Sequence, residues 1–201
     1  IVVVNDGSKD HTKEVVSRYQ VVLLNHIINR GQGAALRTGI EFASKQDECK
    51  YIVTYDADGQ HRLEDVESML KTISSQNLDI ILGSRFIKNE NENMPLGRWI
   101  MLKFATLFLG FVYGLNFTDA HNGLRLFKKE CASKILPTID NFVHASEIPY
   151  LIKKNRLNYT EIPVKIKYTN YSIGKGQKTS NFLRVGKYTL LHKLQMIFFD
   201  K

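Results

Sequence analysis

The sequence has little cysteine and lacks the motifs that mark several common classes of binding protein. Cys49 and Cys131 have neither the spacing of metal ligands nor that of a disulfide framework, so we expect reduced thiols in a cytosolic protein. Paired Cys and His ligands and the aromatic–basic signature of RNA-binding domains are also missing, which excludes nucleic acid as the expected partner. No internal repeat or linker divides the chain, so we expect one domain over residues 1–201.

Basic side chains outnumber acidic ones. The net charge is +8 at pH 7 and the pI is about 9.4, which indicates anionic partners such as nucleotides or phospholipid headgroups. Residues 1–4 form an apolar run that predicts a strand rather than the basic start of a signal peptide. Because a strand begins at the first residue, we expect a fragment that at least one strand and one helix precede in the full protein.

A buried strand followed by two carboxylates is the central feature of the sequence. Residues 51–55 are rich in β-branched and aromatic side chains without alternation, which is typical of a strand buried on both faces. Asp56 and Asp58 follow directly and should lie at the carboxyl edge of the sheet, where open α/β folds place their ligands. Two carboxylates beside the permissive backbone of Gly59 suit a hard divalent cation, although turn chemistry alone also favours this sequence.

Apolar runs alternate with helical patterns through the first half of the chain, which predicts an α/β fold with a mainly parallel sheet and helices on both faces. The runs cover residues 1–4, 21–24, 51–55 and 79–85. Two of them end in side chains with two possible roles. Asp6 is either a helix cap or a ligand contact, and Arg85 is either a surface residue or a partner for a phosphate.

Two glycines open the helix that follows residue 30. The amides near Gly31 and Gly33 could face a phosphate or ribose, and small residues there permit close helix–sheet packing. The segment matches neither the phosphate loop nor the dinucleotide-binding glycine pattern, so it is a weak signal by itself.

Polar side chains recur in the second half. Asp119, Asn122 and Arg125 precede a short strand and exceed what a turn needs, although Asn-Gly is ordinary turn chemistry. Glu147 lies near the amino end of a helix, where the dipole favours a carboxylate for structural reasons. Residues 159–168 alternate in polarity, and Pro163 predicts an edge strand.

Residues 99–117 are strongly apolar. Glycines and a lysine within them favour a helix that lies on a membrane surface, or one that packs as an ordinary core helix, over a spanning segment. A basic loop at residues 171–178 and an amphipathic helix at 180–199 are expected to follow.

Taken together, these segments resemble the family-two glycosyltransferases, which have the GT-A (nucleotide-diphospho-sugar transferase) fold, and within them the dolichyl- or polyprenyl-phosphate sugar transferase branch. The matching segments are Asn-Asp-Gly-Ser at 5–8, Asn-Arg-Gly-Gln-Gly at 29–33, Asp-Ala-Asp-Gly-Gln-His at 56–61, Gly-Ser-Arg at 83–85, Asp-Ala-His-Asn-Gly-Leu-Arg at 119–125, Glu147, and Glu-Ile-Pro-Val at 161–164. They occur in the family's order. The family's first strand is missing, as expected for a fragment.

The resemblance implies a metal-dependent, inverting transfer of a hexose from a UDP- or GDP-linked sugar. The implied nucleotide-binding residues are Asp6, Gly7, Asn29, Gly31, Gly33 and Asp56. The implied ligands of Mg²⁺ or Mn²⁺ are Asp58 and Gln60. The candidates for phosphate contacts are Arg85, Arg125, Lys175 and Lys178, and the candidate catalytic residues are Asp119 and Glu147.

The acceptor stays open between two chemistries. A polyprenyl or dolichyl phosphate is already an anion and needs little base catalysis, whereas a glycan or cell-envelope hydroxyl needs a carboxylate base such as Asp119. A non-catalytic nucleotide-sugar binding module is a third hypothesis. The enzyme interpretation implies a peripheral membrane protein at the cytoplasmic face of a membrane.

Overall fold

The computed structural model describes residues 1–88, 91–114, 116–141 and 143–168, together with residues 186, 189 and 191. The elements in these ranges are β1 (Val2–Asn5), α1 (Thr12–Val16), β2 (Val22–Asn25), α2 (Gln32–Ser44), β3 (Tyr51–Thr54), α3 (Leu63–Ser75), β4 (Ile80–Ser84), α4 (Leu96–Tyr113), β5 (Arg125–Lys128), the 3₁₀ helix η1 (Lys129–Lys134), α5 (His144–Lys154) and β6 (Tyr159–Pro163). Lys175, Lys178 and most of the predicted helix at 180–199 lie outside the described residues.

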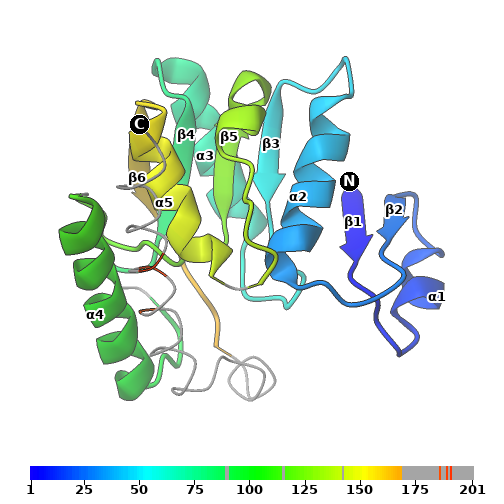
Figure 1. Cartoon of the computed structure of the whole chain (residues 1–201), viewed down its shortest axis with the longest axis horizontal. Coiled ribbons are helices and arrows are strands. Elements are labelled where there is room, and N and C mark those ends of the chain that lie inside the picture. The colour runs from blue at the N-terminus through cyan, green and yellow to red at the C-terminus, as the bar shows by residue number, and fades with distance from the viewer. Residues whose placement is uncertain are drawn as a thin grey trace.

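The strands form a parallel pair, β1–β2, and a four-stranded sheet in the order β3-β5-β4-β6 (Figure 1). In the larger sheet β4 and β6 are parallel, and β5 runs antiparallel to β3 and β4 between them. The prediction of a mainly parallel sheet is therefore confirmed, with β5 as the exception. The register places Arg125 opposite both Thr54 and Leu82, so the first residue of β5 lies near the carboxyl ends of its two neighbours.

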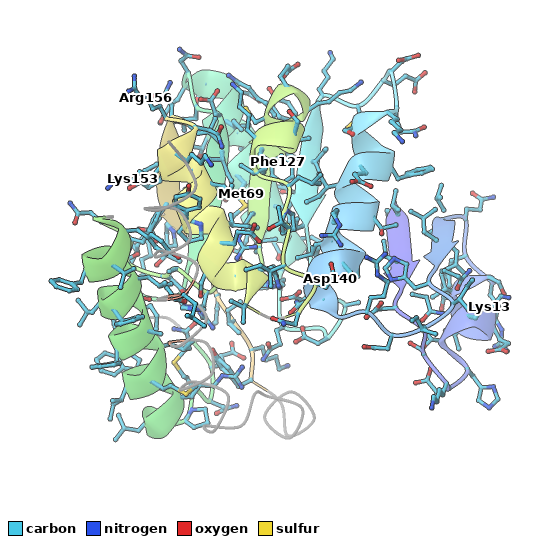
Figure 2. The ribbon with its side chains drawn as sticks, viewed as in Figure 1. Lys13, Met69, Phe127, Asp140, Lys153 and Arg156 are labelled. Carbon is cyan, nitrogen blue, oxygen red and sulfur yellow. The ribbon has the colours of Figure 1, made fainter. Side chains whose placement is uncertain are left out.

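Helices cover both faces of the larger sheet, because its strands carry apolar side chains on both faces. Phe127 belongs to the core cluster that α2, η1 and α5 complete, and Met69 on α3 belongs to the cluster on the opposite face (Figure 2). On β5, Leu126 faces the Met69 cluster while Phe127 faces the other. This two-faced burial confirms the predicted α/β class and fixes the strand ends at which the polar residues gather.

Helix α4 corresponds to the predicted apolar helix and stands at one side of the molecule (Figure 1). It packs through Leu109, Val112 and Tyr113 onto Ala120 and Tyr150. Of the helices in the described ranges, α4 alone is long and apolar enough to cross a membrane, a test that core helices also pass.

One predicted element is shorter than expected. Residues 129–134, which follow β5, form the 3₁₀ helix η1. Strand β6 lies at the edge of the sheet as predicted but ends at Pro163, because its partner β4 ends at Ser84. Beyond that point Ile166 and Tyr168 are still buried, so the apolar side of the expected alternation is retained.

Candidate active site

Asp6 joins the turn after β1 to the glycine-rich turn before α2. Its Oδ1 accepts hydrogen bonds from the amide of Arg30 (3.0 Å) and from His26 Nδ1 (2.7 Å), and its Oδ2 accepts one from the amide of Gly31 (2.7 Å). Burial alone would raise the pKa of Asp6, but these hydrogen bonds lower it below its usual value. Both oxygens are thus engaged by the turn, and a direct contact of Asp6 with a nucleobase stays a prediction.

A second set of contacts fixes the same turn. Nε2 of His26 lies 2.9 Å from Thr38 Oγ1 on α2, so the imidazole links β2, α2 and Asp6. Asn29 donates from Nδ2 to the carbonyl oxygen of Asp6 (3.0 Å). Gly7 has φ +67°, and a Cβ there would lie 2.5 Å from the amide nitrogen of Asn29, so only glycine fits. The predicted residues 6, 29 and 31 therefore form one hydrogen-bonded unit, and Gly7 packs closely against its backbone.

The first turn of α2 packs against a loop that precedes α5. A Cβ on Gly31 would lie 2.6 Å from the carbonyl oxygen of Asp140, and one on Gly33 would overlap the carbonyl of Ile139. Ala34 donates its amide to the Asp140 carbonyl (3.0 Å), beside the amino end of α2 (Figure 2). The backbone of residues 139–141 thus lies so close to α2 that only glycine fits at positions 31 and 33. The contact of these glycines with a nucleotide stays a prediction.

Glu147 on α5 holds this loop in place. Its carboxylate is buried and accepts hydrogen bonds from the amide (3.0 Å) and hydroxyl (2.6 Å) of Thr138 and from the amide of Ile139 (3.1 Å). Both carboxylate oxygens are occupied by these donors. A catalytic role for Glu147 is untested and stays a prediction.

Asp56 lies where β3 ends, beside Arg125. Its Oδ1 accepts a hydrogen bond from Gln32 Nε2 (3.0 Å), and its Oδ2 lies 3.5 Å from His61 Nε2. Burial raises its pKa, but the interaction with His61 and the charge of Arg125 bring the net shift below the usual value, so the carboxylate is ionised at neutral pH. A side chain at Gly123 would overlap this carboxylate. Gln32, which no sequence motif singled out, thus connects the glycine-rich turn to Asp56.

Asp58 is exposed and keeps one carboxylate oxygen free of protein hydrogen bonds among the described residues. Its Oδ1 accepts the amide of Gln60 (3.0 Å), and Nε2 of Gln60 is buried without a hydrogen-bond partner in the described residues. No group of three His, Cys, Asp or Glu side chains in the described ranges is arranged to hold a metal. The free carboxylate oxygen of Asp58 fits a hard cation that takes one or two protein ligands and its remaining ligands from water and a diphosphate.

Arg85 and Asp119 form a buried ion pair at the carboxyl end of β4. Arg85 Nε lies 2.6 Å from Asp119 Oδ2 and Nη2 lies 2.7 Å from Oδ1, while the Arg85 amide also donates to Oδ2 (3.1 Å). Burial disfavours the charged form of both side chains, but the charge and hydrogen bonds of each partner favour the charged form of the other. The pKa of Asp119 is therefore lowered and that of Arg85 is raised. Glu161 accepts the amides of Thr118 (2.7 Å) and Asp119 (2.9 Å) and so positions the loop that carries the carboxylate. The predicted roles of Arg85 toward a phosphate and of Asp119 as a base stay predictions.

Arg125 is buried beside this pair with unused hydrogen-bonding capacity. Its Nη1, the Nδ2 of Asn122 and the Nδ1 of His121 are buried and have no hydrogen-bond partner in the described part of the chain. Desolvation lowers the pKa of Arg125 to about 10 and the pKa of His121 and of His144 to about 4. At neutral pH these histidines are uncharged and Arg125 is a cation without a full set of acceptors, an arrangement that suits an anion.

The structure thus brings most of the predicted residues into two neighbouring groups. One group is Asp6, Gly7, Asn29 and Gly31 around the turn before α2, and the other is Asp56, Arg85, Asp119 and Arg125 at the strand ends of the larger sheet. His26 and Gln32 were missed because a single His or Gln outside a metal or catalytic pattern gives no signal. Glu161 was recognised only as part of a motif, and its contact with residues 118–119 required the fold.

A model of glycosyl transferase family 2 matches residues 1–136. The chain belongs to this family. It is 43% identical over 182 residues to an uncharacterised protein of Methanocaldococcus jannaschii, covering 88% of this chain and 73% of that protein. It is 34% identical over 201 residues to UDP-N-acetylglucosamine–dolichyl-phosphate N-acetylglucosaminyltransferase of Methanococcus voltae, covering 88% of this chain and 78% of that enzyme.

Solved structures show that this family 2 chain has the GT-A fold predicted above. The glucosyl-3-phosphoglycerate synthase of Mycobacterium tuberculosis, in complex with Mn²⁺, UDP-glucose and phosphoglyceric acid, superimposes with a TM-score of 0.68 at 13% sequence identity. The similarity covers 96% of this chain and 67% of the synthase. At this identity the likeness concerns the fold alone.

Proposed function

We propose that the chain is the catalytic domain of an inverting glycosyltransferase that moves a hexose from a UDP- or GDP-linked sugar onto a polyprenyl or dolichyl phosphate. Family membership supports sugar transfer. The Methanococcus voltae relative, whose name gives a UDP-sugar donor and a dolichyl-phosphate acceptor, supports the finer assignment.

The observation that carries the choice of acceptor is the state of the two candidate base carboxylates. Asp119 is fully buried and both of its oxygens bond to Arg85, and both oxygens of Glu147 bond to residues 138–139. A hydroxyl acceptor must lose a proton during the reaction, and neither carboxylate is free to take it. A phosphate oxygen is already anionic and attacks without a base, so the engaged carboxylates favour a phosphate acceptor.

Different residues would bind the nucleoside and the metal ion. The turn that Asp6 organises, with Asn29 and Gly31, would receive the nucleoside beside Asp56. Asp58 and Gln60 would hold Mg²⁺ or Mn²⁺, which supplies positive charge to stabilise the departing diphosphate.

Arg125 would pair its free guanidinium nitrogen with a phosphate oxygen, a charge-assisted contact that its buried position strengthens. The predicted phosphate contacts of Lys175 and Lys178 belong to the same proposal.

In the proposed step an oxygen of the acceptor phosphate forms a bond to the anomeric carbon. The bond from that carbon to the diphosphate oxygen breaks on the opposite face, and its electron pair leaves with the nucleoside diphosphate. No proton needs to move. Asp119 serves as a positioning residue that holds Arg85, and Glu147 positions the loop against α2.

A donor screen tests the proposal. Purified protein with Mn²⁺ and polyprenyl phosphate is incubated with radiolabelled UDP- and GDP-sugars, and label in the lipid fraction is measured together with released nucleoside diphosphate. We expect one donor to label the lipid with stoichiometric release of its nucleotide. Binding of nucleotides by calorimetry without transfer from any donor would instead support a non-catalytic nucleotide-sugar binding module.

A further inference from the structure

The solvent-facing side of α4 carries no polar side chain. The exposed residues of this helix are Leu96, Gly97, Ile100, Phe104, Leu107 and Phe111. Three of them are very exposed: Phe111 at 89%, Leu96 at 73% and Leu107 at 71%. A helix on the surface of a water-soluble domain normally turns its polar residues outward, so this apolar stripe is the reverse of the usual pattern.

The stripe is continuous and lies opposite the buried face of the helix. At about 100° per residue, its large side chains fall within an arc of about 80°, and the buried residues Ala105, Leu109 and Val112 centre on the other side. The 18 residues of α4 give a stripe about 27 Å long. This is a large apolar surface, with a shape suited to lying along another apolar surface.

The buried face excludes a spanning helix. Leu109 and Val112 pack on Ala120, and the Ala120 amide donates to Thr106 Oγ1 (3.3 Å). If α4 crossed a bilayer it would lose these contacts with the domain, whereas if it lies in the plane of the interface it keeps them. We propose that the stripe of α4 docks into the surface of a lipid bilayer.

Charge favours a bilayer over a second copy of the chain. The charged residues within α4 are Arg98 and Lys103, both cationic, and the whole chain carries +8. Lys103 lies at the edge of the stripe, with Nζ 4.2 Å from the ring centroid of Phe86, whereas Arg98 lies on the buried side of the helix, with its guanidinium carbon 5.2 Å from the ring centroid of Tyr168. A cation at the edge of an apolar face suits anionic headgroups, and the net positive charge of the chain opposes contact between two copies.

Docking here would place the candidate site at the membrane. The inner side of α4 contacts Ala120, which follows Asp119, and Phe86, which follows Arg85. A lipid phosphate at the interface would then need to move only a short way to reach this pair and Arg125. This consequence rests on the proposed function, while the docking itself is independent of it.

The chain contains a single tryptophan, Trp99, and it lies on α4. Its fluorescence therefore reports contact between this helix and lipid. We expect the full chain to co-sediment with vesicles of equal parts phosphatidylcholine and phosphatidylglycerol, and brominated acyl chains in those vesicles to quench Trp99. Bromines near the headgroups should quench more than bromines at the bilayer centre, because the helix lies in the interface.

The double variant Leu107→Ser/Phe111→Ser should lose at least about tenfold in vesicle partitioning, because two large side chains no longer insert. Tyr19→Ser is the matched control and should bind as the parent does: Tyr19 is 67% exposed and closely follows α1, which lies at the opposite side of the molecule from α4 (Figure 1). Unchanged thermal unfolding would show that both variants fold.

Absence of vesicle binding by the parent chain, or equal binding by the double variant, would overturn the docking proposal. A concentration-dependent dimer that the double variant abolishes, without vesicle binding, would assign the stripe to a second copy and overturn it as well. A separate assay with a short, water-soluble prenyl phosphate tests the proposed function: vesicle binding without any transfer would overturn that function alone.

Discussion

Arg85 holds Asp119 through a two-pronged ion pair that is almost wholly shielded from water, with side-chain exposures of 8% and 0%. The pair joins the end of β4 to the loop that precedes β5, and Glu161 on β6 anchors that loop from the other side. Contacts from the end of β4, from the loop before β5 and from β6 therefore converge on Asp119. Its hydrogen bonds explain why this loop is rigidly placed beside Arg125 and why Asp119 has no oxygen to spare.

Breaking the pair should destabilise the protein strongly. Arg85→Ala leaves the Asp119 carboxylate buried without its partner, and we expect the free energy of unfolding to fall by about 3–5 kcal/mol. Arg62→Ala, which breaks an exposed pair with Glu64 (Nε to Oε2, 3.2 Å), should leave the free energy unchanged within error. Urea denaturation measures both. A loss for Arg85→Ala no larger than for Arg62→Ala would show that the buried pair does not hold the loop.

Removing the divalent cation or its expected ligand should stop transfer. Chelation should abolish turnover, and Asp58→Ala should reduce it about 10²–10³-fold, because the charge on the departing diphosphate loses its stabilisation. Asp47→Ala changes an exposed carboxylate on another turn and should have no effect. Initial rates against Mn²⁺ concentration provide the measurement. Full activity of Asp58→Ala at saturating Mn²⁺ would remove Asp58 from the metal site.

Removing the link between Asp6 and α2 should weaken donor binding. His26→Phe deletes the hydrogen bonds to Asp6 and Thr38, so the turn that carries Asn29 and Gly31 is less well ordered. We expect the Kd for the nucleoside diphosphate to rise up to about 30-fold, at about 1 kcal/mol for each of the two hydrogen bonds, with kcat little changed. Thr38→Val removes only the outer contact and should cost less. Calorimetric titration of both variants tests this order, and a reversed order would contradict it.

Stability should fall as the pH drops from about 6.5 to about 4. His121 and His144 have pKa values of about 4 in the folded protein against 6.5 when unfolded, so in this window the unfolded chain binds protons that the folded one does not. Each histidine contributes at most about 1.4 kcal/mol per pH unit. His144→Asn should flatten the dependence, and His11→Asn, at a side chain that is 93% exposed, should not. Equal slopes in chemical denaturation for parent and His144→Asn would refute this assignment.

Much of the fold could be predicted because the apolar runs are strong and regular. Each of the strands expected at residues 1–4, 21–24, 51–55 and 79–85 is present within a residue of its predicted bounds. The position of β5 between β3 and β4 could not be predicted, because strand order depends on contacts between residues far apart in the sequence. The same limit applies to the site, where the motif residues were identifiable but their partners were not.

Asp119 illustrates the difference. As a carboxylate in a polar turn it was a reasonable candidate base, and only the structure shows Arg85 bonded to both of its oxygens. Asp6 is similar, since its hydrogen bonds to His26 and to the amides of residues 30 and 31 depend on how β1, β2 and α2 pack. A side chain's chemistry can be read from the sequence, but whether that side chain is free to act depends on tertiary contacts.

The most direct test of the account compares two acceptors that differ only in their reacting group. The kcat/KM of the protein is measured with Mn²⁺, the preferred nucleotide sugar, and either polyprenyl phosphate or the corresponding polyprenol. We predict rapid formation of the lipid-phosphate-linked sugar and no detectable transfer to the alcohol, because both oxygens of Asp119 and both of Glu147 are already hydrogen-bonded. Transfer to the polyprenol at a comparable rate would contradict the proposed base-free attack by a phosphate.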